Sequence, residues 1–289
     1  MSSVESKRDR VMASAENKET ASPMARRVAE MARTLRIQRG WTQEQEGKEI
    51  GYSAAAISAM ETCAQPASDA MLVELNRVLG NGTPIFETAR KYMRMERLPE
   101  QFQDYALLEE AAISLQLFAA NVVHGLFQTE AYARALIGGS FPPLPDQRVE
   151  ELVQLRMART ALFDRDPLPM IEIIIDEAVL RRVIGSEEIM REQLLHLVEC
   201  ARRRNVTLLV LPLDAGKYGE YAGDRGEMDL LETSAHEHLV YLEPQDESLL
   251  ISDPVKVSVY ARRYAKIRSQ ALGPRESLDL IKRLAGVTE

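Results

Sequence analysis

The sequence holds few of the residues that build disulfide frameworks and metal centres. It has two cysteines, four histidines and one tryptophan among 289 residues. Two cysteines, Cys63 and Cys200, cannot form a disulfide framework or a four-cysteine zinc site, and they fit a reducing compartment. No apolar run reaches the roughly 18 residues of a membrane span, and the polar start MSSVESKRDR lacks the apolar segment of a signal peptide. We therefore expect a cytoplasmic protein with no membrane partner.

The chain also lacks a net positive charge, which argues against a general binder of polyanions. The formal net charge is −8, and residues 1–95 hold 14 lysines and arginines against 12 aspartates and glutamates, so this part carries +2 and the remainder −10. A DNA-binding module usually shows a clear basic face. Here an arginine-rich segment precedes three glutamates that we expect beside the phosphates of any bound DNA: Glu44, Glu46 and Glu49. Non-specific affinity for DNA should therefore be weak and strongly dependent on salt.

The stretch from Trp41 to Cys63 predicts two short helices joined by a turn. Thr42 is a suitable N-cap, and Gln45 three residues later can return the hydrogen bond, as in a capping box. Gly51 permits the left-handed conformation that ends a helix, and Ser53 is a second N-cap. Two short helices around a turn that contains glycine are typical of a helix-turn-helix.

Apolar residues at helical spacing extend this pair into a bundle over residues 23–95. Ile57 and Met60 form the apolar stripe of the second short helix. Further helices are predicted at about 25–39, 69–79 and 85–95 from the same periodicity. Residues 1–22 are polar and lack such a stripe, so we expect a disordered tail there.

Three motifs lie around the turn: Arg36-Ile37-Gln38-x-Gly40-x-Thr42-Gln43, Gly51-x-Ser53 and Ile57-Ser58-x-x-Glu61. Together they resemble the Cro/repressor-type (Xre) DNA-binding family. The resemblance implies that Arg36 pairs with Glu61 and ties the first helix to the third. It also implies that the third helix lies in the major groove and reads bases with its N-terminal residues. The alternative is an unrelated small helical bundle.

The positions that match the DNA contacts of that family carry little hydrogen-bonding capacity. On the reading helix they are Ser53, Ala54, Ala55, Ala56, Ser58 and Ala59, and Gln43 stands at a phosphate-contacting position. Alanine offers a base only its methyl group, and each missing bidentate pair forgoes about 1–3 kcal/mol of discrimination. Further candidate phosphate contacts, which could equally be a solvated face, are Arg26, Arg27 and Arg39.

Residues 96–289 predict a second domain of mixed α/β type, so the chain as a whole is expected to be α+β. Short β-branched or apolar runs predict strands at 171–176, 206–212, 227–231, 238–242 and 248–251, in a central sheet of four or five strands. A helix at 186–200 between the first two strands suggests a parallel crossover. Asp146 is expected to cap a long helix to about Phe163, with Arg148, Arg156 and Arg159 outside its apolar residues.

This part also contains three motifs: His124-Gly125-Leu126-Phe127-Gln128-Thr129-Glu130, Glu177-Ala178-x-Leu180-Arg181-Arg182 and Asn205-Val206-Thr207. They are similar to the C-terminal domain of the WhiJ-like regulators, which join an Xre module to this domain. The resemblance implies a bacterial transcriptional regulator whose second domain meets a small partner protein, in some members as an antitoxin-like pair.

No residue pattern indicates catalysis, a metal or a cofactor. His236-x-His238 would place two imidazoles on one face of a strand, as half of a metal site, but a third ligand is not near in sequence. Asp176 and Glu177 are adjacent and diverge in direction, which does not suit a general acid–base pair. His124 is interpreted as a turn or packing residue. We therefore expect a protein that is not an enzyme.

Two functions remain open from the sequence. The first is a transcriptional regulator, associated with the nucleoid, that binds double-stranded operator DNA as a homodimer. The second is an adaptor or antitoxin-like interaction protein whose helix-turn-helix has lost DNA readout. Ligand sensing in the second domain is compatible with either function.

Overall fold

The computed structural model describes residues 22–96, 100–217, 219–244 and 247–287. The chain divides into two compact units, Met1–Glu96 and Arg97–Glu289, where the sequence led us to expect a division after residue 95. The tail expected over residues 1–22 lies outside the described residues, except for Ser22. The expected α+β class is confirmed, because a helical N-terminal part is followed by a unit that combines helices with a sheet.

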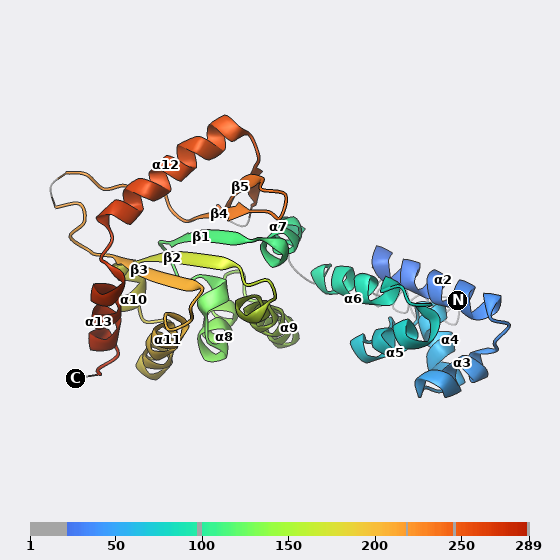
Figure 1. Ribbon diagram of the computed structural model, residues 1–289. Coiled ribbons are helices and arrows are strands. Elements are labelled where there is room, and N and C mark those ends of the chain that lie inside the picture. The colour runs from blue at the N-terminus through green and yellow to red at the C-terminus, as the bar shows by residue number, and fades with distance from the viewer. Residues whose placement is uncertain (1–21, 97–99, 218, 245–246, 288–289) are drawn as a thin grey trace, which may run out of the picture. The chain divides into compact units, whose positions relative to one another are not determined.

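The N-terminal unit is a bundle of short helices (Figure 1). Four of its helices begin at a serine or threonine whose side chain accepts a hydrogen bond from the first turn. Thr42 and Gln45 form the expected capping box, and Gly51 ends that helix at φ +78°. The described helices of this unit are α2 (Pro23–Gln38), α3 (Gln43–Ile50), α4 (Ala54–Glu61), α5 (Asp69–Leu79) and α6 (Ile85–Met95).

The inner faces of these helices form a continuous core. Ile57 is fully buried and Met60 nearly so, as their helical spacing predicted. They pack with Leu72 and Leu75 of α5 and with Phe86 of α6. Burial of each such side chain stabilises the fold by about 1.5–3 kcal/mol. The packing holds α4 by one face and leaves its opposite face uncovered by the core.

The described part of the second unit contains a six-stranded sheet in the order β3-β2-β1-β4-β5-β6. Pairing is parallel between β1, β2 and β3, and antiparallel from β1 through β4 and β5 to β6. The strands are β1 (Ser114–Ala119), β2 (Met170–Asp176), β3 (Val206–Leu211), β4 (Met228–Glu232), β5 (His238–Leu242) and β6 (Leu249–Ile251).

The expected count of four or five strands was wrong, because β1 was not predicted. This strand lies at the centre of the sheet and pairs with both β2 and β4. Its sequence, SLQLFA, is separated from the end of α7 (Glu100–Ala111) by two residues. No glycine or proline lies between the two elements, so the sequence gives no turn signal where the helix ends and the strand begins.

The predicted parallel crossover is present: α10 (Glu177–Arg181) and α11 (Glu187–Cys200) connect β2 to β3. A second crossover connects β1 to β2 through η1 (Gly125–Phe127), α8 (Glu130–Gly138), α9 (Asp146–Ala158) and η2 (Arg159–Asp164). The single long helix expected from Asp146 to Phe163 is therefore two elements. The α-helix ends at Ala158, and a 3₁₀ segment follows it.

Helices cover both faces of the sheet. Figure 1 shows α8, α9, α11 and α13 (Pro274–Leu284) on one side, and α12 (Pro254–Gln270) on the other. Successive residues of a strand point to opposite faces, so Leu117 and Ile173 belong to the first core, and Phe118 and Ile174 to the second. The sheet thus separates two apolar cores within one unit.

Candidate functional site

Arg36 of α2 and Glu61 of α4 form a two-point ion pair inside the helix-turn-helix. Arg36 Nε donates to Glu61 Oε1 over 2.6 Å, and Nη2 donates to Oε2 over 2.9 Å. Arg36 Nη1 also donates to the backbone carbonyl of Trp41 over 2.8 Å. Burial alone would raise the pKa of Glu61, but hydrogen bonds from Arg36 and Gln43 outweigh it and hold that pKa below its usual value. The resemblance to the Xre family implied this pairing.

Gln43, the expected phosphate contact, is joined to the same carboxylate. Its Nε2 donates to Glu61 Oε2 over 2.8 Å, and the residue is half-buried at the first turn of α3. The amide is therefore held in one orientation by a neighbour that is itself fixed by Arg36. One of the two N–H groups of the amide is used within the module, which reduces what Gln43 can offer to DNA.

Glu46 does not lie where the sequence placed it. The expectation that Glu44, Glu46 and Glu49 together face DNA is wrong for Glu46, whose side chain is fully buried. The helical period turns Glu46 toward the core beside Ile50, four residues later. Its carboxylate lies 3.5 Å from Arg36 Nε, and neither of its oxygens has a hydrogen-bond partner among the described residues. Burial, with the nearby charge of Glu61, raises the pKa of Glu46 to about 7.

The outward face of α4 presents mainly methyl groups. Ser53, Ala54 and Ala55 are exposed, whereas Ala56, Ser58 and Ala59 are half-buried. Ser53 Oγ accepts a hydrogen bond from Ala56 N over 3.1 Å and thus serves as the helix cap. Of the six positions expected to approach bases, three are therefore readily accessible, and the single hydroxyl among these already accepts one hydrogen bond as the helix cap.

The candidate phosphate contacts outside the turn differ in their surroundings. Arg26 and Arg27 are exposed on α2. Arg39 is exposed just beyond that helix, with its guanidinium carbon 5.2 Å from the centroid of the Trp41 ring. It also donates to Asn81 Oδ1 over 3.2 Å. Arg39 is therefore partly held in place, whereas no described contact holds Arg26 or Arg27.

Two backbone features of this module bear on its stability. A Cβ added at Gly47 would lie 2.4 Å from the carbonyl oxygen of Tyr52, so only glycine permits this close turn between α3 and α4. Sequence analysis did not single out Gly47. Cys63, two residues beyond the end of α4, has φ +57°, a left-handed conformation that costs a non-glycine residue about 1 kcal/mol.

The second unit contains a cavity of about 480 Å³ that we term the polar cavity. It lies where β1 ends and β4 begins, between η1, α8, α9 and β5. Ligand sites in sheets with parallel strands often lie beyond the carboxyl ends of those strands. The ionisable residues that line it are His124, Arg156, Arg159, Glu227, Asp229, Tyr241 and Glu243.

A network of buried charges supports one side of the polar cavity. Arg159 donates to both carboxylate oxygens of Glu109, over 2.8 and 2.7 Å. Asp229 accepts a hydrogen bond from the hydroxyl of Tyr105 over 2.7 Å and lies 3.3 Å from His124 Nε2. Buried polar groups that are paired in this way rigidify their surroundings.

Sequence analysis missed this site. Arg156 and Arg159 were expected outside the apolar residues of their helix, but both line the cavity. Gly125 was a signal for the site, because a Cβ there would lie 2.8 Å from Arg159 Nη1 and 3.6 Å from Arg156 Nε. His124, interpreted as a turn residue, accepts a hydrogen bond at Nδ1 from Leu126 N and also lines the cavity.

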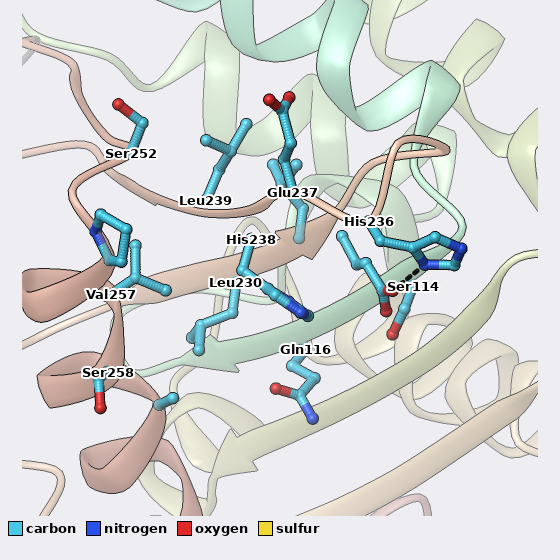
Figure 2. Close-up of a pocket in the computed structure, with 14 residues that line it drawn as sticks. Ser114, Gln116, Leu230, His236, Glu237, His238, Leu239, Ser252, Val257 and Ser258 are labelled. Carbon is cyan, nitrogen blue, oxygen red and sulfur yellow. Dashed lines mark hydrogen bonds and ion pairs between the residues drawn. The ribbon is translucent and has the colours of Figure 1, made fainter.

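A larger cavity of about 720 Å³, the sheet cavity, lies between the start of α12 and strands β1, β4 and β5. Figure 2 shows His238 pointing from β5 toward β1, with His236 apart from it at the edge. The expectation of two imidazoles on one strand face was wrong, because His236 precedes β5 in a turn with φ +61°. Its Nδ1 lies 2.7 Å from Glu232 Oε1. Among the described residues, no group of three or more potential ligands could hold a metal ion.

The remaining reactive residues have structural partners. Asp176 accepts hydrogen bonds from Ala178 N and from the hydroxyl of Tyr221, and Glu177 accepts from Arg181 and from Leu213 N. Burial raises the pKa of the Cys200 thiol to about 11. This value keeps the thiol protonated and unreactive at neutral pH.

Residues 102–283 match the family described as a domain of unknown function, DUF5753, over more than half of the chain. The chain belongs to the DUF5753 family. Both cavities lie within the DUF5753 region, and the helix-turn-helix precedes it. No curated protein and no solved structure matches the chain. Within the described part of the chain, no helix combines the length and apolar character needed to cross a membrane.

Proposed function

We propose that this DUF5753 protein is a cytoplasmic, nucleoid-associated transcriptional regulator that binds double-stranded operator DNA through α3 and α4. One observation carries the proposal: Arg36, Gln43 and Glu61 join the helices around the turn through hydrogen bonds of 2.6–2.9 Å. A module that positions a helix for the major groove needs such a rigid base. The resemblance to the Xre family supports the same function.

The exposed surface of α4 indicates how this regulator would choose its site. Ala54 and Ala55 can approach thymine methyl groups, but they cannot make the bidentate hydrogen bonds by which proteins read guanine or adenine. Specificity would then depend on DNA shape, while phosphate contacts of Gln43, Arg26 and Arg27 would supply affinity and fix the position of the module on the duplex. A homodimer that binds two half-sites would double these weak contacts.

The second unit would act as the partner-binding or ligand-binding part of the regulator. Its similarity to the WhiJ-like C-terminal domain implies a small protein partner. Its two cavities, of about 480 and 720 Å³, are within the size range of sites for small molecules. Occupancy of this unit would then control the DNA-binding unit.

The test is genome-wide crosslinking, followed by binding of the full chain to enriched fragments at several salt concentrations. We expect discrete sites and an affinity that falls as salt rises. Ala55→Glu should abolish binding, because a carboxylate at the exposed start of α4 would face phosphates. Thr88→Glu, on the exposed face of α6, is the matched control. Absence of enriched sites together with absence of a salt slope would end this proposal.

A second function is favoured by the methyl surface of α4 and by the exposed Glu44 and Glu49 of α3. In this alternative the protein is an adaptor or antitoxin-like partner that does not read DNA. Native affinity purification would then recover a small protein at constant stoichiometry. Neither the wild-type protein nor the Ala55→Glu variant would bind DNA. Recovery of no protein partner would exclude the adaptor.

A further inference from the structure

Arg156 presents a positive charge to the polar cavity without a negative partner. Its Nη1 donates to the neutral amide oxygen of Gln128 over 3.0 Å, and no carboxylate of the described residues forms an ion pair with it. Burial and the neighbouring charge of Arg159 lower the pKa of Arg156 to about 10. It is still protonated at neutral pH, and a half-buried cation that forms no ion pair is destabilising. The guanidinium is therefore suited to receive an anionic group.

Three carboxylates line the same cavity, and they differ in how many hydrogen bonds they accept. Glu227 accepts from the backbone nitrogens of Asn121 and Val122, and Asp229 is held by the contacts described above. Among the described residues, Glu243 accepts one hydrogen bond, from the hydroxyl of Tyr241 over 3.2 Å. Although the residue as a whole is exposed, desolvation of its carboxylate raises its pKa, and Arg156 and Arg159 act in the opposite direction. Glu243 is therefore the carboxylate that would gain most from a cationic ligand group.

Arg156 and Glu243 line one cavity and influence each other, yet they do not meet. Each lowers the cost of the other's charge, but the two do not form an ion pair within the described residues. A ligand that carries a negative and a positive group close together could bridge this gap. The adjoining wall is apolar and is formed by Leu136, Ile137 and Leu152.

We propose that the polar cavity binds a free α-amino acid with an apolar side chain. Its carboxylate would bind Arg156, its ammonium group would bind Glu243, and its side chain would pack against Leu136, Ile137 and Leu152. Both charged groups of an amino acid are attached to one carbon, which suits two protein charges that do not touch. The cavity volume of about 480 Å³ admits such a molecule.

Ligands with a single charge fit these walls less well. A carboxylic acid would pair with Arg156 but bring a second negative charge near Glu243. An amine would pair with Glu243 and leave Arg156 unpaired beside an added cation. The zwitterion alone satisfies both residues, and charge-assisted hydrogen bonds of this kind are the stronger ones in proteins.

The test is isothermal titration calorimetry of the full chain with L-leucine, L-valine, L-methionine and L-phenylalanine. The two halves of leucine, 4-methylpentanoate and 3-methylbutylamine, are titrated as single-charge controls. We expect at least one amino acid to bind, and each single-charge control to bind at least about tenfold more weakly than that amino acid. The proposal is overturned if no amino acid binds with a Kd below about 10 mM, or if a single-charge control binds as tightly as the amino acid.

Variants then assign the two charges. Arg156→Gln and Glu243→Gln should each weaken binding about tenfold or more. Arg148→Gln, two turns earlier on α9 and outside the cavity lining, should leave it unchanged. Retention of full affinity in a folded Arg156→Gln variant contradicts the proposal. If that variant does not fold, Glu243→Gln and the single-charge controls decide.

This site deepens the proposed function, because it rests on the second unit being the sensing part of a regulator. The titrations contain no DNA, so the two proposals fail separately. Amino-acid binding without any DNA site would remove the regulator and keep the ligand site. DNA binding without amino-acid binding would do the reverse.

Discussion

Glu46 lies with its carboxylate 3.5 Å from Arg36 Nε, while both of its own oxygens lack a hydrogen-bond partner among the described residues. Arg36 gives its two-point contact to Glu61 instead. One guanidinium therefore lies beside two buried carboxylates but donates hydrogen bonds to only one of them. The helix-turn-helix is held by the first pairing, and its stability should depend on pH through the second.

Replacing Arg36 by alanine should strongly destabilise the N-terminal unit. The change leaves Glu46 and Glu61 buried without a cation, and loss of one partner of a buried pair costs about 3–5 kcal/mol. Trp41 is the single tryptophan and lies in this unit, so its fluorescence during urea unfolding measures the effect in the full chain. Arg27→Ala, exposed on the same helix, should change the free energy of unfolding little. Equal unfolding midpoints for the two variants would contradict the proposed role of the pair.

Glu46→Gln should change how stability depends on pH. Burial raises the pKa of Glu46 to about 7, above its value in the unfolded chain, so the folded state binds the additional proton between about pH 4.5 and 7. The stability that comes from this bound proton is fully present below that window and is lost as the pH rises through it. Between pH 5 and pH 8, the free energy of unfolding of the variant should therefore rise by about 2 kcal/mol relative to that of wild type.

Trp41-monitored urea unfolding at the two pH values measures this difference. Glu44→Gln, exposed on the same helix, is the matched control and should run parallel to wild type. A constant offset between Glu46→Gln and wild type at both pH values would show that Glu46 is not titrating in the folded state.

Gly47→Ala should destabilise the turn between α3 and α4. The new Cβ would lie 2.4 Å from the carbonyl oxygen of Tyr52, and backbone cannot yield as a flexible side chain can. We expect a loss of about 1–3 kcal/mol, typical of overpacking, despite the better helix propensity of alanine. Lys48→Ala, exposed at the next position, should be near neutral. An unchanged urea midpoint for Gly47→Ala would disprove the close approach.

Gly125→Ala should disturb the polar cavity. Its Cβ would meet Arg159 Nη1 at 2.8 Å, and Arg159 cannot move without leaving Glu109 and the ring of Phe102. Differential scanning calorimetry should show the second unit destabilised by about 1–3 kcal/mol. Gly138→Ala is the matched control, because its Cβ would make an ordinary contact at 3.9 Å to Val149. The prediction fails if both variants unfold at the wild-type temperature.

The helix-turn-helix was predictable because its signals are local. The Thr42 cap, the Gln45 return bond and the Gly51 helix end lie within ten residues, and each depends on its neighbours in sequence. Glu46 was misplaced because its charge was weighed above its position. It falls one residue before Gly47 and four before Ile50, both of which face inward.

The second unit was less predictable because its features depend on distant parts of the chain. Strand β1 is defined by its bonds to Ile173 and Leu231, which lie far along the sequence. The polar cavity likewise joins residues from 102 to 243. Gly125 gave a local hint, but only the packed arginines show why a side chain is excluded there.

The central position of β1 has a consequence for how the two halves of the sheet can move. Parallel strands β2 and β3 lie on one side of it, and the antiparallel β4, β5 and β6 on the other. Hydrogen bonds from one half of the sheet to the other therefore pass through a single six-residue seam. A shift of either half relative to the other must shear this seam, and the polar cavity opens at its end.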